Sequence, residues 1–183
     1  MKRDAKQVLT ELLVLKAQGG DEAAFTDLYE TWSKDLFRLI RFIIKESHAA
    51  EEIAQEAWIS IARGLKRLDD PSVFCSWAFR IARRRCIDWL RKQQSDRKKK
   101  LALESNVEVQ GDEAQGESMV VSELLEEIQK MDTGSRMLIH LFYETGLSVS
   151  EVAEAMELRA GTVKSRLFAI REKLKAKLER KIR

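Results

Sequence analysis

Basic side chains are concentrated in two blocks of this 183-residue sequence, and these blocks are the groups best suited to bind a ligand. Residues 80–100 include 10 basic and 2 acidic residues, and residues 159–183 repeat these counts. Between the blocks, residues 101–129 carry 8 acidic residues and no Lys or Arg. Two separated cationic blocks offer two surfaces to a polyanion, and nucleic acid is the commonest such partner. Charge alone leaves one alternative open, a pair of solvated helix faces.

Residues that perform catalysis or bind metals show no comparable grouping. His48, His140, Cys75 and Cys86 lack the spacing of a zinc site. The sequence contains no glycine-rich phosphate loop and no nucleophile with a neighbouring base. We therefore expect no metal, no cofactor and no catalytic centre, so the protein is not expected to be an enzyme.

The same sequence features indicate the compartment. Two cysteines are too few to staple a secreted fold, and no apolar run is long enough to cross a bilayer. The N-terminal segment MKRDAKQVLTELL places Glu11 where a signal peptide needs an uninterrupted apolar core. We expect a cytoplasmic protein without membrane insertion.

The elements that must position the basic side chains are predicted to be helices. One Pro and eight Gly are too few turn residues for a many-stranded fold. Apolar residues recur at intervals of three and four in residues 21–44, 47–65 and 71–94, which predicts three helices. Asp21 and Ser47 are the expected N-caps, and Asp70 followed by Pro71 is a helix-start signal. The expected core residues are Phe25, Leu28, Trp32, Leu36, Leu39, Ile40, Ile43, Ile44, Ala50, Ile53, Ala54, Ala57, Ile61, Leu65, Phe74, Ala78, Ile81, Ala82, Cys86 and Leu90.

The apolar periodicity stops between residues 95 and 116, where the chain becomes polar and acidic and contains Gly111 and Gly116. This composition is typical of a flexible linker. We expect an all-α fold of two helical domains, at residues 1–94 and 118–183, joined by a flexible acidic linker at residues 95–117.

The second domain contains a helix-turn-helix pattern. The run Ser148-Val149-Ser150-Glu151 is a capping box that predicts a short helix ending at Met156. A turn at residues 157–160 then leads into a final basic helix. In that helix an inward face is expected at Val163, Leu167, Ile170 and Leu174.

A different face of the final helix is predicted to enter the major groove of DNA. Lys164 offers a donor to base edges, Ser165 a hydroxyl and Phe168 an apolar contact for a thymine methyl group, and Ala169 lies beside them. The residues better placed to neutralise phosphates are Arg166, Arg171 and Lys173.

Three runs of the sequence resemble the extracytoplasmic-function (ECF) subfamily of bacterial sigma-70 factors. GLSVSEVAEAMELRAGTVKSRLFAIREKL, from Gly146, resembles the helix-turn-helix that binds the promoter −35 element. AEEIAQEAWISIARGL, from Ala50, resembles the segment that docks on the β′ clamp of RNA polymerase. FCSWAFRIARRRCIDWLRKQ, from Phe74, resembles the −10 segment. The chain departs from the family pattern at Met156-Glu157, where Leu-Gly is common, at Arg159-Ala160, where Pro is common, and at Ala169, which is often basic.

The resemblance implies a sigma factor with domain 2 at residues 1–94 and domain 4 at residues 118–183. It implies binding to the β′ clamp and β flap of core RNA polymerase, to double-stranded −35 DNA and to single-stranded −10 DNA. Family members are commonly held inactive by an anti-sigma factor, and no feature of this chain identifies one. The alternative is a stand-alone helix-turn-helix regulator, which would need no clamp-docking helix.

The resemblance also implies site residues. For polymerase these are Glu52, Gln55 and Glu56, at i, i+3 and i+4 on one helix face; the other reading of this face is ordinary solvation. For the −10 element they are Arg80, Arg83, Arg84 and Arg91, with Asp69 and Ser72 in the loop 68–73. For the −35 element they are Thr162, Lys164, Ser165, Arg166, Phe168, Ala169 and Arg171. Phe74, Trp77 and Trp89 have types suited to base stacking, but their helical spacing favours core positions.

Overall fold

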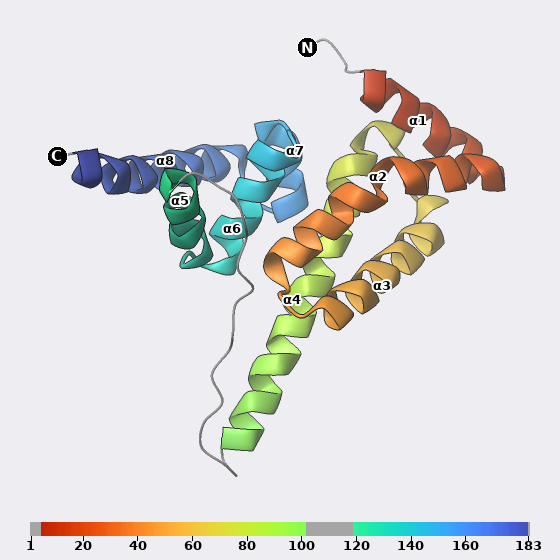
Figure 1. Ribbon diagram of the computed structural model, residues 1–183. Coiled ribbons are helices and arrows are strands. Elements are labelled where there is room, and N and C mark those ends of the chain that lie inside the picture. Colours follow the sequence, from red (N-terminus) through yellow and green to blue (C-terminus); the bar gives the residue numbers. More distant parts are fainter. Residues whose placement is uncertain (1–4, 102–118, 183) are drawn as a thin grey trace.

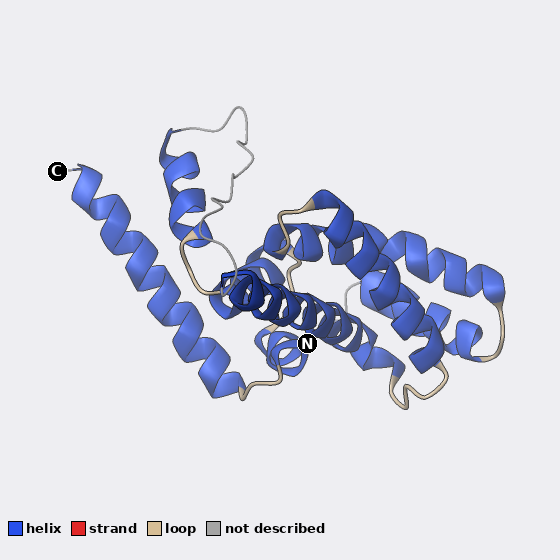
Figure 2. Cartoon of the chain, turned by 90° about the horizontal axis from the view of Figure 1, so that it is seen from below, coloured by secondary structure: helices blue, strands red, loops and turns tan. Residues whose placement is uncertain are grey.

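A computed structural model describes residues 5–101 and 119–182, and every regular element in these residues is a helix (Figures 1 and 2). The first half contains α1 (Ala5–Gln18), α2 (Glu22–Ile43), α3 (Ser47–Leu65), the 3₁₀ helix η1 (Pro71–Val73) and α4 (Phe74–Leu101). The second half contains α5 (Met119–Gln129), α6 (Thr133–Ile139), the π-helical turn η2 (His140–Glu144), α7 (Val149–Met156) and α8 (Ala160–Ile182). The predicted all-α class is confirmed. Most of the predicted linker lies outside the described residues.

The three helices predicted in the first half form a bundle around a shared core. Leu28 of α2, Ile61 of α3 and Phe74 of α4 are fully buried. Trp32 of α2 packs edge-on against Phe79 of α4, with 6.2 Å between ring centroids. Of the predicted core residues, four are only partly buried: Phe25, Ala54, Ile81 and Leu90.

The predicted helix ends agree with the structure in part. Asp21 caps α2 as predicted, because its carboxylate accepts a hydrogen bond from the Ala24 N–H at 3.0 Å. The predicted cap at Ser47 is wrong: Ser47 is the first residue of α3, and Glu46 holds the cap position without a side-chain bond. Helix α4 also continues past Gln94 to Leu101, since arginine, lysine and leucine are good helix formers even where no apolar stripe exists.

Helix α1 was not predicted from the sequence. Its apolar residues occur on several sides, so no single stripe stands out: Leu13 and Val14 are buried, whereas Leu12 and Leu15 are about half exposed. Helix amphipathicity is the signal that a periodicity search detects, and it is weak here.

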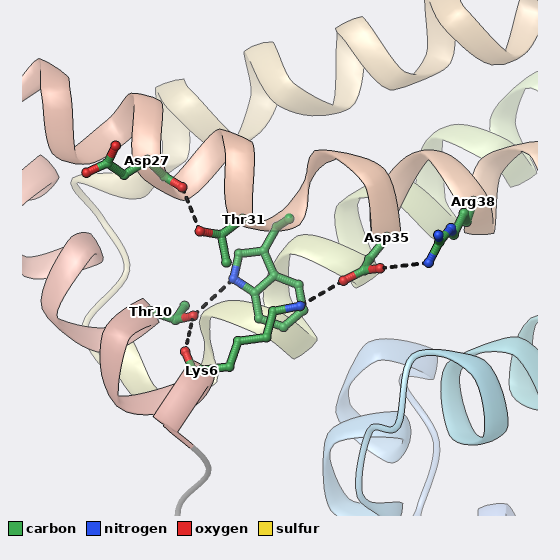
Figure 3. A network of polar contacts seen from close by, with 7 residues as sticks. Lys6, Thr10, Asp27, Thr31, Asp35 and Arg38 are labelled. Atoms are coloured by element: carbon green, nitrogen blue, oxygen red, sulfur yellow. Dashed lines mark hydrogen bonds and ion pairs between the residues drawn. The ribbon is translucent and has the colours of Figure 1, made fainter.

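A polar network holds α1 against α2 (Figure 3). The indole N–H of Trp32 donates to the buried hydroxyl of Thr10 at 3.0 Å, and this hydroxyl donates to the Lys6 carbonyl at 2.7 Å. The Lys6 ammonium lies 2.8 Å from the Asp35 carboxylate and 3.8 Å from the centroid of the Trp32 ring. Asp35 also pairs with Arg38. A buried indole is thus satisfied by a neighbouring helix, as burial of a polar group requires.

The second half packs on the first. Buried residues of α6, α7 and α8, among them Leu138, Val152 and Leu167, form the core of the second half. Helix α7 lies against α4, while α6 and η2 contact α2. The two predicted domains therefore share a contact surface.

Trp77 of α4 packs against Gly64 of α3. The ring is partly buried against the core and lies 6.1 Å from the Phe74 ring, centroid to centroid. A Cβ added at Gly64 of α3 would lie 2.8 Å from a ring carbon of Trp77. Position 64 therefore has to be glycine for the two helices to approach this closely.

Replacing Gly64→Ala should lower the free energy of unfolding. Overpacking costs about 1–3 kcal/mol, which exceeds the gain in helix propensity of at most about 1 kcal/mol. Gly161→Ala is the control, because no heavy atom lies within 4 Å of its added Cβ. Urea unfolding followed by circular dichroism measures both variants, and a Gly64→Ala protein as stable as wild type would contradict the close contact.

Candidate nucleic-acid and protein interfaces

The helix-turn-helix forms as the sequence predicts. The Ser148 hydroxyl accepts from the Glu151 N–H at 3.3 Å, and the Glu151 carboxylate accepts from the Ser148 N–H at 2.8 Å, which confirms the capping box. Helix α7 ends at Met156, and Glu157 follows with φ 56° and ψ 44°, in the left-handed region. The final helix, α8, starts at Ala160, and its residues Val163 and Leu167 are buried on its inner face.

The face of α8 predicted for −35 DNA is open. Lys164, Ser165 and Ala169 are exposed, and the Phe168 side chain is 63% exposed, which is unusual for a large apolar residue. Arg166 and Arg171 are exposed on flanking positions. Thr162 is half-buried, and its carbonyl accepts a bond from the Ser165 hydroxyl at 3.0 Å.

An ion pair orients the far end of α8. The Lys177 ammonium lies 3.0 Å from the Glu127 carboxylate of α5, and the hydrogen bond from Lys177 lowers the pKa of Glu127. The helix that carries the predicted DNA-reading face is thereby connected to α5 as well as to α7.

The arginines predicted for the −10 element are not equivalent. Arg83 and Arg84 both pair with the Glu157 carboxylate of the helix-turn-helix, Arg83 at 3.0 Å. The hydrogen bond from Arg84 is the main reason that the pKa of Glu157 lies below its usual value. Arg91 is exposed and lies 3.9 Å from Asp88, and within the described residues no ion pair involves Arg80. The structure thus brings Arg83 and Arg84 together and leaves Arg91 apart.

The predicted −10 loop is supported by α1. Asp69 and Ser72 are exposed, as a base-reading role requires. The Ser72 N–H donates to the Asp70 carboxylate at 2.9 Å, which starts η1 at Pro71. The side-chain amide of Gln18 donates to the carbonyls of Leu65 and Leu68, at 2.9 and 2.7 Å, and so holds the chain leading into this loop. No local pattern in the sequence indicates this role of Gln18.

The side chains predicted for polymerase share one exposed face of α3. Glu52 lies 3.4 Å from His48, and Glu56 lies 3.6 Å from Arg85. Gln55 is exposed on the same face and lines an apolar groove of about 620 Å³ between α2 and α3. The groove was not predicted from the sequence. The signal that could have indicated it is a pair of aromatic residues one turn apart on α2, Phe25 and Tyr29. Its apolar lining includes Phe25, Tyr29, Phe37, Ala54, Trp58 and Ile59.

A second contact joins the two halves at the end of α2. Arg136 of α6 donates to the Phe42 carbonyl and lies over the Phe42 ring, 5.4 Å from its centroid. The His140 ring packs against the same phenyl ring at 5.3 Å, and burial lowers the pKa of His140 although the Glu144 carboxylate opposes this. Among the described residues, no hydrogen-bond partner reaches the buried Nε atoms of Arg83 and Arg136.

Comparison with known proteins assigns the chain to a family. The family model for sigma-70 region 2 matches residues 28–96, and the model for sigma-70 region 4 matches residues 122–174. The ECF RNA polymerase sigma factor SigW of Bacillus subtilis (strain 168) is 29% identical over 94% of this chain and 98% of its own length. The ECF RNA polymerase sigma-E factor of Escherichia coli (strain K12) is 29% identical over 98% of this chain and 99% of its own. The chain belongs to the ECF subfamily of sigma-70 factors.

Two solved structures have the fold of this ECF sigma factor. CnrH, in complex with the cytosolic domain of CnrY, matches with a TM-score of 0.69 at 23% identity over 93% of this chain and 97% of its own. The Bartonella quintana sigma factor RpoE, in complex with the anti-sigma factor NepR, matches with a TM-score of 0.70 at 19% identity over 85% of this chain and 96% of its own. The region 2 match covers most of α2, all of α3 and most of α4, and the region 4 match ends within α8.

Two kinds of feature do not occur in the part of this ECF sigma factor that the structure describes. No group of three or more His, Cys, Asp or Glu residues is arranged to hold a metal ion. No helix there combines the length and the apolar character that crossing a bilayer demands.

Cys75 and Cys86 should be unreactive in the folded protein. Both thiols are free and buried, and burial raises the pKa of each to about 12. A pKa raised this far leaves roughly one thiol in 10⁴ ionised at pH 8, and the thiolate is the reactive form. Titration with Ellman's reagent should detect no fast-reacting thiol in native protein and two in denaturant. Rapid labelling of the native protein would contradict this burial.

Proposed function

We propose that this protein is a sigma factor that binds core RNA polymerase and directs it to promoters by recognising −35 and −10 elements and aiding DNA melting. The observation that carries the proposal is the presence, in order in one chain, of a region 2 match around an exposed carboxylate face and a region 4 match around an open helix-turn-helix. The protein acts by binding and catalyses no reaction itself. Its place of action is the cytoplasm, where bacterial polymerase and promoters are.

Each half of the chain has its own role in this proposal. Residues 1–94 act as sigma domain 2, residues 118–183 act as sigma domain 4, and residues 95–117 connect them. Because α4 continues to Leu101, the first part of this connection is helical.

Polymerase is contacted through α3. Glu52, Gln55 and Glu56 dock on the β′ clamp, and the apolar groove beside Gln55 supplies the buried centre that a polar face alone lacks. The exposed fractions of Tyr29 and Ile59, 46% and 43%, support a surface that a partner covers. The second domain is expected to contact the β flap.

Promoter DNA is bound at two places. Arg80, Arg83, Arg84 and Arg91 form the cationic track for single-stranded −10 DNA, and Asp69 and Ser72 contact its bases. Double-stranded −35 DNA is read by the open face of α8. The residues assigned to it are Thr162, Lys164, Ser165, Arg166, Phe168, Ala169 and Arg171.

An anti-sigma factor is a further expected partner. The structural neighbour CnrH was solved in complex with the cytosolic domain of CnrY, and RpoE was solved in complex with the anti-sigma factor NepR. By analogy, an antagonist of this kind would hold the present chain inactive until a signal releases it.

Lys164→Ala should change which −35 bases are preferred, whereas Arg171→Ala should weaken binding to all sequences alike. A side chain on a base edge is worth about 1–3 kcal/mol at one position, whereas a phosphate contact carries no sequence information. Binding of the full chain with core polymerase to a panel of single-base −35 variants separates the two effects. Identical profiles for both mutants would remove the distinction between these residues.

Glu52→Lys combined with Glu56→Lys should abolish binding to core polymerase without unfolding the protein. Both side chains are about three-fifths exposed, His48 is exposed and Arg85 is partly exposed, so removal of the two carboxylates opens no cavity. Charge reversal in a desolvated docking face costs several kcal/mol. Gel filtration with core polymerase, run beside a thermal melt, measures both properties.

The matched control is Asp27→Lys combined with Glu30→Lys on α2, which changes net charge equally at exposed positions away from this face. It should bind core polymerase as wild type does. If the α3 double mutant also binds normally and promoter-directed transcription with core polymerase is absent, the stand-alone regulator becomes the better account.

A further inference from the structure

The helix-turn-helix covers part of the surface that is assigned to −10 DNA. Helix α7 packs along α4, and the Glu154 carboxylate accepts a 2.7 Å bond from the buried hydroxyl of Ser76. One turn further, Glu157 pairs with both Arg83 and Arg84. A carboxylate shared by two guanidinium groups presents its oxygens much as a phosphate does. In this arrangement the two arginines already hold an anion from their own chain.

The backbone at Glu157 makes the identity of this residue informative. Among the described residues it alone, apart from glycine, has a positive φ, and a side chain in this region is strained. Glycine is the usual residue where a helix ends in this conformation. The N–H of Glu157 completes the helix end whatever its side chain, so the carboxylate is not needed for the turn. Its contacts with Arg83 and Arg84 are what distinguish glutamate from glycine here.

The ion pairs between Glu157 and the two arginines can break and re-form readily. Glu157 and Arg84 are 39% and 60% exposed, so their ion pair lies in high dielectric and is weakened by salt. The Nε atom of Arg83 is buried without a hydrogen-bond partner in the described residues. Beyond α4, the halves meet in a hydrogen bond from Gln7 to Glu151 at 3.2 Å and in the packing of the His140 ring on Phe42.

We propose that Glu157 is an intramolecular latch: by neutralising Arg83 and Arg84 it holds the free chain closed and masks them from single-stranded DNA. The idea rests on the proposed function for the identity of the masked ligand, but the latch itself is a property of the chain alone. Nucleic acid can then occupy Arg83 and Arg84 only when α7 and α8 move away from α4. Arg80 and Arg91 are not held by Glu157 and remain available for a first, weaker contact.

Opening is measured by energy transfer between dyes on introduced cysteines, Lys16→Cys in α1 and Lys175→Cys in α8, because both native thiols are buried. Glu157→Gln should lower the transfer efficiency, and Glu157→Lys should lower it further by placing a cation beside two others. The triple variant Arg83→Glu, Arg84→Glu, Glu157→Lys restores opposite charges and should restore the wild-type efficiency. An unchanged efficiency in Glu157→Lys would overturn the latch.

Masking is measured separately, by fluorescence anisotropy with a labelled single-stranded oligonucleotide at low salt. If the latch keeps about nine-tenths of the chain closed, Glu157→Gln should raise the apparent affinity by up to about tenfold, the limit for a fully open chain. Glu172→Gln is the matched control, since it removes the same charge from an exposed site on α8. An opened Glu157→Gln chain that binds no better than Glu172→Gln would overturn the masking. Failure of the wild-type chain to support promoter-directed transcription would instead count against the proposed function and leave the energy-transfer result standing.

Discussion

Burial of one face of α4 is the constraint on which the rest of the structure depends. Phe74, Phe79, Ala82 and Cys86 are all fully buried against the bundle. Each large apolar side chain stabilises this packing by about 1.5–3 kcal/mol, so the helix cannot rotate about its axis. Since side-chain directions along a helix are fixed by its geometry, this packing also fixes where the arginines point. The cationic surface must then meet solvent, a polyanion or a carboxylate of the chain itself.

The contact between the halves combines polar and apolar interactions. Hydrogen bonds and ion pairs cross it, and the Nε atoms of Arg83 and Arg136 are buried there without partners among the described residues, while buried apolar residues of both halves belong to one cluster. A buried unpaired donor costs about 1–3 kcal/mol, whereas exposed ion pairs contribute about 0–1 kcal/mol. The polar contacts alone therefore add little net free energy to the closed arrangement.

The sequence was sufficient where one physical signal dominated. Apolar periodicity predicted the bundle and the buried face of α8, and capping chemistry predicted Asp21 and the Ser148–Glu151 box. Prediction from the sequence failed where the local signal was weak or fitted two positions. Helix α1 has apolar residues on several sides, so its periodicity is weak. Ser47 suits the first turn of a helix as well as the N-cap position before it. Contacts between distant residues, such as Gln18 with the −10 loop or Glu157 with two arginines, depend on how helices pack. No local pattern encodes them.

The closed arrangement masks the three proposed surfaces unequally. The polymerase face at Glu52 and Glu56 is exposed, and so is the −35 face at Lys164 and Phe168, while Arg83 and Arg84 are paired. If the proposed assignments hold, core polymerase docks on α3 before the halves separate, and its binding energy shifts the equilibrium toward the open chain to the extent that it favours that form. The free chain, lacking this energy, keeps Arg83 and Arg84 paired with Glu157. In this proposal the capture of single-stranded DNA depends on polymerase, because one carboxylate lies on the turn between two helices.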